Sequence, residues 1–265
     1  MDPLALIDFL GFSVGEVERA ILILARLTGL FLSAPFFSRA AGPSRIKAAL
    51  LLALTVVIFP LVAPWSGENK SHVPAMFAAA ITETVVGATM GMLVHWVLVS
   101  VQVAGNVIGF QMGLSMAMVM DPTSGIQEGV LSNLLYLTVL VLFISVGGHF
   151  LLLEAVTRSF QAIPLGGGLP HAGNALESAL KALAAMFNLA LLISAPILVA
   201  TTLLYIGLGL INRASPQIQV FFLSMPMAQM MGFIILGLTM ALFARVMLRE
   251  IDTFFTFAFH SIGFQ

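Results

Sequence analysis

The sequence predicts an all-α, integral membrane-type protein, and three observations support this fold class. First, 60% of the 265 residues are hydrophobic and only 9% are charged, whereas a soluble domain usually carries about a quarter charged residues. Second, the mean hydropathy is +1.06, and the apolar residues gather into stretches of at least the ~20 residues with which a helix crosses a bilayer. Third, no stretch alternates polar and apolar residues with the period of two that a membrane barrel requires.

Six apolar stretches are expected to form long helices. In order, they cover residues 20–37, 48–65, 73–110, 130–156, 182–211 and 218–248. The breaks between them contain glycine and proline, which favour turns. The segment PLGGGLP, residues 164–170, is the most linker-like of these breaks. The main domain boundary is therefore expected there, between a part that covers residues 1–165 and a part that covers residues 174–265.

The third stretch carries glycines at a helical spacing. Gly87 and Gly91 are four residues apart, and so are Gly105, Gly109 and Gly113. At 100° per residue, the helix returns from Gly91 to Gly105 within about 40° of the same face. Small residues at this spacing let helices approach closely in a bilayer, so Gly87, Gly91 and Gly105 predict a helix-packing face.

The fifth and sixth stretches predict a kinked helical hairpin. Pro196 and Pro226 lie inside them, and a proline within a helix removes a backbone hydrogen bond and bends the helix. The turn between the two stretches, residues 212–217, is short.

Three charged residues, Arg26, Glu83 and Glu154, lie inside the predicted helices. Each would cost ~2.5–3.5 kcal/mol at the centre of a bilayer. They are expected to be buried charges that pair within the helix bundle or lie near an interface, rather than a proton or ion pathway. The remaining Lys and Arg residues divide almost evenly between alternate loops, so the positive-inside rule assigns no orientation.

The loop GFQMGLSMAMVMDP, residues 109–122, is uncharged until Asp121 and rich in methionine. Gly109 and Gly113 supply backbone freedom, and Pro122 closes the loop, so these three residues are its expected hinges. The composition favours a deformable hydrophobic stopper. A buried loop that only fills space is the alternative, since irregular backbone at membrane depth is tolerated where protein covers it.

Enzyme chemistry and cofactors are not expected. Cysteine is absent and the five histidines are scattered, so no metal or catalytic motif is present. The net charge of −1 does not suggest a nucleic-acid partner. Met112 and Met116 lie one helical turn apart and thioethers select Cu(I), which leaves a stand-alone solute or metal transporter as an alternative, although methionine is more often an adaptable core residue.

Four segments resemble the FliR family of the flagellar type III export gate. They are RLTGLFLSAPFFSRAAGPSRIK (26–47), GFQMGLSMAMVMDPTSG (109–125), GGHFLLLEAVTRSFQAIPLG (147–166) and INRASPQIQVFFLSMP (211–226). The resemblance extends over about residues 26–248. It implies a structural subunit that assembles with FliP, FliQ and FlhB into a pore for unfolded rod, hook and filament proteins. A homologue of the virulence injectisome is the alternative within this class.

The resemblance also implies an architecture and a site. Residues 1–165 would be a FliP-like part, and residues 174–265 a FliQ-like hairpin with a C-terminal tail. The protein would lie among lipids in the bacterial inner membrane, within the flagellar basal body, and the assembled gate would be displaced toward the periplasm. The loop 109–122 would plug the pore, with Phe110, Gln111, Met112, Leu114, Met116, Met118 and Met120 as the plug residues.

Overall fold

The computed structural model describes residues 13–34, 43–63, 73–114, 129–167, 172–215, 217 and 219–261. The regular elements in these ranges are all helical, as the composition predicts. The chain forms two compact units that interleave along the sequence. The first unit comprises Met1–His95, Gly147–Leu180 and Asp252–Gln265, and the second comprises Trp96–Val146 and Lys181–Ile251.

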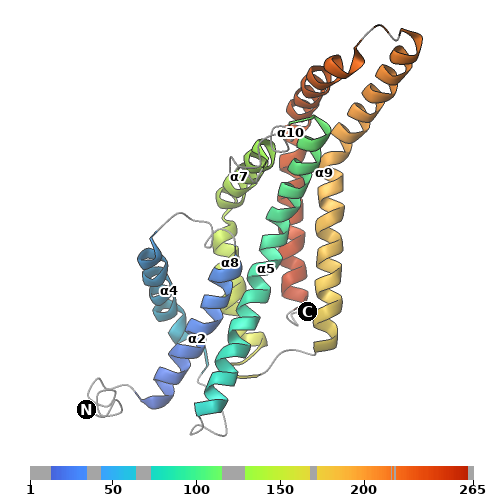
Figure 1. The fold of residues 1–265 in the computed structure, drawn as a ribbon. Helices are drawn as coiled ribbons and strands as arrows, with labels where there is room; N and C mark the ends of the chain where they lie inside the picture. The colour runs from blue at the N-terminus through green and yellow to red at the C-terminus, as the bar shows by residue number, and fades with distance from the viewer. Residues whose placement is uncertain are drawn as a thin grey trace. The chain divides into compact units, whose positions relative to one another are not determined.

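The first unit is built from α2 (Val14–Ser33), α4 (Ser44–Ile58), the 3₁₀ helix η1 (Phe59–Leu61), the N-terminal part of α5 (Val73–Gln111), and α8 (Gly148–Ala162) (Figure 1). Helix α2 starts before the predicted apolar stretch because Ser13 and Glu16 form a reciprocal capping box. Their side chains satisfy backbone N–H groups that have no partner within the helix.

Arg19 closes the end of the α4–η1 segment. Its guanidinium donates hydrogen bonds to the backbone oxygens of Phe59 and Val62 and lies 4.4 Å from the centre of the Phe59 ring. A cation at a helix C-terminus satisfies carbonyl groups that no N–H of the helix reaches. This contact joins α2 to the segment that follows it.

The second unit comprises the C-terminal part of α5, α7 (Val130–Ser145), and most of α9 (Ala172–Ala214) and α10 (Val220–Ser261). All four helices contribute to its apolar core, which includes Val101, Leu135, Ile197 and Phe243. Helices α9 and α10 form the predicted hairpin (Figure 1). Both are longer than the predicted apolar stretches, since α9 begins at Ala172 and α10 ends at Ser261, and both remain helical through Pro196 and Pro226.

The fourth apolar stretch is not one helix, as its composition predicted, but two. Helix α7 ends at Ser145, and α8 begins at Gly148. Between them Gly147 has φ +79°, the left-handed conformation that ends a regular helix and that glycine adopts without strain. The break divides the stretch between the two compact units.

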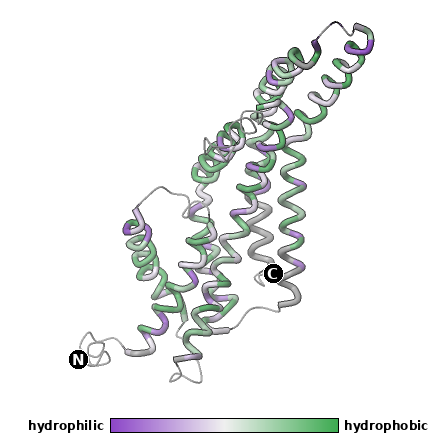
Figure 2. The backbone as a smooth tube through the Cα atoms, in the orientation of Figure 1, coloured by the Kyte–Doolittle hydropathy of each residue, from purple (hydrophilic) through white to green (hydrophobic). Residues whose placement is uncertain are grey.

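Apolar residues predominate along the coloured part of the chain, with polar residues interspersed (Figure 2). Among the described elements, the helical segments Ser44–Leu61, Pro74–Gln111, Leu180–Ala214 and Phe222–Glu250 are each long and apolar enough to cross a membrane. Helix α2, predicted to contain the first span, is not among them because charged residues occupy its first two turns and Arg26 its centre. Only 17% of the α10 segment is buried within the chain, so its surface requires lipid or other protein.

Candidate functional site

The predicted plug loop begins where α5 ends. Gly113 has φ +73°, its N–H donates to the carbonyl of Phe110 (3.0 Å), and the N–H of Leu114 donates to the carbonyl of Gly109 (2.9 Å). These two bonds with a left-handed glycine form a Schellman motif, which terminates a helix while satisfying its last carbonyls. Gly113 therefore acts as the helix stop from which the loop departs.

Two neighbouring helices hold this helix end in place. The Tyr205 hydroxyl on α9 donates a hydrogen bond to the carbonyl oxygen of Gln111 at 2.8 Å. Met112 is fully buried, and a Cβ added to Gly232 on α10 would lie 2.5 Å from its sulfur. The absence of a side chain at position 232 thus makes room for Met112.

The side chains at this end of α5 differ in their exposure to solvent. Phe110 is 75% exposed and Met112 is completely buried, because they lie two residues apart and so on nearly opposite faces of α5. Gln111 and Leu114 are partly buried. Met112, one of the predicted plug residues, is buried in this chain against Gly232 of α10. Met116, Met118, Met120 and Pro122 lie outside the described residues.

A polar cluster in the first unit contains two of the three predicted internal charges. Arg26 Nε lies 2.5 Å from Glu83 Oε2, and both side chains are at least 98% buried. The other two guanidinium nitrogens donate to the hydroxyl of Ser159 and the carbonyl of Ile163, each at 3.0 Å. Arg26, on α2, thus uses all three of its guanidinium nitrogens on α5, on α8 and on the residue that follows α8.

Two further contacts complete this cluster. The second oxygen of Glu83 accepts a hydrogen bond from the N–H of Gly166 at 2.9 Å, and the Arg26 guanidinium lies 4.1 Å from the centre of the Phe160 ring. Buried ions persist when their hydrogen-bonding groups are matched in this way. The cluster is a structural connection, and its members bring the turn after α8 against α5.

Glu154 does not share this environment, in contrast to the expectation that it is buried. Its side chain is 47% exposed and pairs with Arg158 at 2.5 Å. Leu152, Ala155, Val156 and Ser159 form the buried face of α8, and Glu154 projects from the other side. The pair is four residues apart on one helix, the spacing at which side chains meet on a helix surface.

The predicted glycines of α5 all lie at close helix crossings, but against two different helices. A Cβ at Gly87 would overlap the backbone of Arg26 on α2, and one at Gly91 would overlap Ser33. A Cβ at Gly105 would lie 2.5 Å from the Cα of Ser132 on α7. Gly29 on α2, which the glycine spacing of α5 did not indicate, faces Thr84 of α5 in the same way, so the α2–α5 crossing has glycine on both sides.

The described residues contain no group of three or more His, Cys, Asp or Glu side chains that could hold a metal ion. The described residues present a set of close helix contacts, a buried ion pair and an end of α5 that neighbouring helices hold in place, with an exposed Phe110. Such an arrangement holds the helices of this chain together and leaves apolar surface exposed.

Comparison with known proteins places these features in a family context. The profile of bacterial export proteins, family 1, matches residues 17–254. Flagellar biosynthetic protein FliR of Escherichia coli (strain K12) is 31% identical over 223 residues, which cover 83% of this chain and 84% of that protein. The protein of the same name from Bacillus subtilis (strain 168) is 31% identical over 224 residues, which cover 83% and 85%.

A relative with a different printed name also matches. Surface presentation of antigens protein SpaR of Salmonella typhimurium is 24% identical over 210 residues, which cover 79% of this chain and 78% of that protein. The match to the family profile extends through both compact units and includes the end of α5.

Proposed function

Because this chain belongs to the bacterial export proteins, family 1, we propose that it is a structural channel subunit of the flagellar type III protein export gate. In this role it assembles with FliP and FliQ into a pore through which unfolded rod, hook and filament proteins leave the cell, with FlhB bound to the complex. The proposal rests on family membership and on two relatives named flagellar biosynthetic protein FliR, each of which aligns with this chain over most of its length.

The exposed apolar surface of the chain supports assembly with other membrane helices. Helices α5, α9 and α10 have 39, 43 and 42 residues, which at 1.5 Å per residue corresponds to about 60 Å. The hydrocarbon core of a bilayer is only ~30 Å thick. Helices of this length and apolarity extend beyond one bilayer, which is consistent with a gate displaced toward the periplasm of the inner membrane and covered by other subunits.

We further propose that residues 109–122 form the plug of this pore. The observation that carries this proposal is the end of α5, where a Schellman glycine releases an uncharged loop from a helix that Tyr205 and Gly232 hold in place. An anchored base with an uncharged, glycine-containing continuation suits a stopper that opens without dissociating. Burying one large apolar side chain is worth ~1.5–3 kcal/mol, so several such side chains keep a pore closed but yield to cargo.

In this proposal the plug residues have distinct roles. Phe110 and Leu114, with Met116, Met118 and Met120, supply the sealing surface, while Met112 and the backbone of Gln111 fix its base. The proposed parts of the chain, a FliP-like region (1–165) and a FliQ-like hairpin (174–265), are assigned by resemblance. A role in an injectisome is the second candidate, because SpaR also matches most of the chain.

Co-purification tests the assignment to an export gate. The full-length chain is expressed with FliP and FliQ from the same genome, extracted in detergent and weighed by native mass spectrometry. We expect one large heteromeric complex that contains this chain. A stable monomer that binds neither subunit would contradict the proposal and favour a stand-alone transporter.

Ion leakage tests the plug. We expect deletion of residues 114–118, or Gly113→Val, to raise ion leakage across the membrane of cells. Each variant should still assemble with FliP and FliQ, and the mass of the complex should differ from that of the wild type only by the mass of the substitution or deletion. The valine forces a β-branched side chain into the left-handed conformation of Gly113. Gly207→Ala is the control, because nothing lies within 4 Å of the added Cβ; a tight membrane after the deletion would exclude the plug role.

A further inference from the structure

The end of α5 has a backbone carbonyl that a side chain from another helix satisfies. The Schellman motif at Gly113 pairs the carbonyls of Gly109 and Phe110, but this motif does not reach the next carbonyl along the helix, that of Gln111. The Gln111 carbonyl accepts instead the 2.8 Å hydrogen bond from the hydroxyl of Tyr205. Tyr205 on α9 therefore completes the cap of α5.

The two helices that hold the end of α5 do so by different means. On α10 the contact is packing, since Met112 is fully buried where Gly232 leaves space. On α9 it is one neutral hydrogen bond, and Tyr205 is 38% exposed. Burial of a large apolar side chain contributes more free energy than a neutral hydrogen bond, whose partners bind water once they separate. The Tyr205 contact is therefore the first to break, and Met112 keeps the helix end attached.

Helix α9 has a weak point nine residues before Tyr205. Pro196 lies inside the helix and has no N–H to donate to the carbonyl of Leu192. The hydroxyls of Ser194 and Thr201, on either side of it, donate to carbonyls four residues earlier at 2.9 and 2.7 Å, a contact that bends helices. Figure 1 shows α9 changing direction along its length. The part of α9 beyond Pro196 can therefore tilt relative to the part before it.

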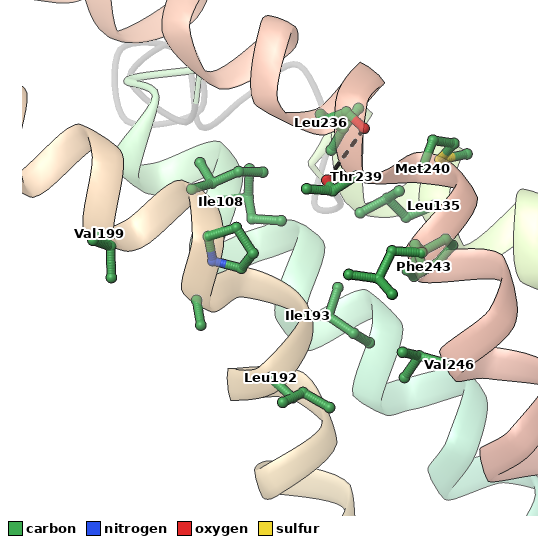
Figure 3. Close-up of a pocket in the computed structure, with 14 residues that line it drawn as sticks. Ile108, Leu135, Leu192, Ile193, Val199, Leu236, Thr239, Met240, Phe243 and Val246 are labelled. Atoms are coloured by element: carbon green, nitrogen blue, oxygen red, sulfur yellow. Dashed lines mark hydrogen bonds between the residues drawn. The ribbon is translucent and has the colours of Figure 1, made fainter.

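An apolar pocket next to Pro196 gives α9 room for this tilt. The pocket lies within the second unit, has a volume of about 520 Å³, and is lined by Pro196 together with Ile108 of α5 and Leu135 of α7 (Figure 3). Close-packed side chains resist displacement, so a helix beside unfilled space bends more easily than one inside a packed core. A tilt of about 10° at Pro196 displaces Tyr205, about 14 Å further along the helix, by roughly 2 Å. Such a displacement breaks a hydrogen bond of 2.8 Å.

We propose that Tyr205 is a releasable cap through which α9 regulates the plug. While the hydroxyl bonds to the Gln111 carbonyl, the last turn of α5 is complete and the base of the loop is fixed. When α9 tilts at Pro196, the cap is lost and the last turn of α5 opens, while Met112 stays against α10. This inference rests on the proposed plug function of residues 109–122 and adds the element that controls it.

Hydrogen–deuterium exchange of the purified full-length chain in detergent tests the cap without reference to export. Tyr205→Phe removes only the hydroxyl, and we expect the amides of residues 109–114 to exchange about two- to tenfold faster, as loss of one neutral hydrogen bond implies. Tyr136→Phe changes the other tyrosine of the chain, in the apolar core of the second unit, and should leave this exchange unchanged. Unchanged exchange in Tyr205→Phe, or equal acceleration in both variants, would overturn the proposal.

A further variant tests the weak point in α9. Pro196→Ala restores a backbone N–H to the helix and should make it stiffer, so we expect the amides of residues 109–114 to exchange about twofold or more slowly than in the wild type. Exchange as fast as in the wild type, or faster, would show that bending at Pro196 does not release the cap.

Ion leakage across the membrane of cells connects the cap with the plug. We expect Tyr205→Phe to raise leakage about twofold or more, but less than deletion of residues 114–118, because Met112 still holds the end of α5. If the deletion leaks and Tyr205→Phe does not, the plug function stands and regulation by Tyr205 is excluded. If the deletion itself stays tight, the plug function fails and the cap has nothing to control, even where exchange responds as expected.

Discussion

The Arg26–Glu83 pair shows at the residue scale how this chain accommodates charge in an apolar interior. Four groups from one short part of the sequence contact the two side chains: Ser159, Ile163, Gly166 and the ring of Phe160. A buried ion pair by itself adds little stability, because desolvation offsets the attraction. Once the pair is formed, however, loss of one member leaves the other charge buried without its counter-ion.

This reasoning predicts the effect of single and paired substitutions. Arg26→Met should destabilise the chain by ~3–5 kcal/mol, because Glu83 remains buried and loses its counter-ion. The double variant Arg26→Met/Glu83→Met should recover much of this loss. The measurement is denaturant unfolding of the purified full-length chain in detergent, followed by circular dichroism.

Arg158→Met is the matched control for Arg26→Met. Arg158 and Glu154 are about half exposed, and exposed pairs contribute ~0.2–1 kcal/mol. If Arg158→Met lowered the free energy of unfolding as much as Arg26→Met, burial would not be what determines how much an ion pair contributes to stability.

At the scale of the helix, close approach depends on glycine at defined positions. Gly87 and Gly91 contact α2, whereas Gly105 contacts α7, so one stripe of α5 serves two crossings. Gly232 serves a different purpose, since it admits the Met112 side chain. The spacing of the α5 glycines predicted close packing, but the sequence contains no signal for which helix meets which glycine.

The crossing of α5 and α7 provides a sharp test at this scale. We expect Gly105→Ala to destabilise the chain, because the added Cβ would lie 2.5 Å from the Cα of Ser132 and the helices must separate. Gly237→Ala should be neutral or stabilising by up to ~1 kcal/mol, because its Cβ meets nothing within 4 Å and alanine favours helix over glycine. Thermal unfolding of the two variants in the same detergent compares them directly; equal midpoints would show that α5 and α7 do not approach as closely as described.

At the scale of the whole molecule, the chain leaves far more apolar surface exposed than a soluble protein tolerates. Large exposed apolar residues occur on every long helix, including Phe110, Leu203 and Leu238. Contiguous apolar surface of this kind marks contact with lipid or with other proteins. Each compact unit is assembled from separate parts of the sequence, so each depends on contacts between residues that are far apart in the chain.

Leu238 on α10 tests whether this surface is buried in the assembled protein. It is 78% exposed within the chain, and an aspartate there should cost ~2.5–3.5 kcal/mol if lipid or a partner helix covers it. We therefore expect Leu238→Asp to lower the yield of the complex with FliP and FliQ at least tenfold, measured by co-purification from membranes. Leu238→Ala should keep most of the yield, and a full yield with aspartate would indicate that this face meets water.

The sequence by itself determined the all-α membrane class, the extent of α5 and the hairpin of α9 and α10, because length and apolarity are local properties of the chain. It also identified Gly113 and the internal charges, since a glycine or a charge within an apolar segment stands out. It did not predict the break at Gly147 or the exposure of Glu154, which depend on the packing around α8.

Only the tertiary structure decided which residues act together. Tyr205 and Gly232 lie about a hundred residues beyond the helix end that they hold, and Ser159 and Gly166 are equally remote from Arg26. Nothing in their local sequence distinguishes them from neighbouring residues. Their roles follow from the places where helices cross. Each crossing depends on the surfaces of both helices, and no single stretch of sequence contains both.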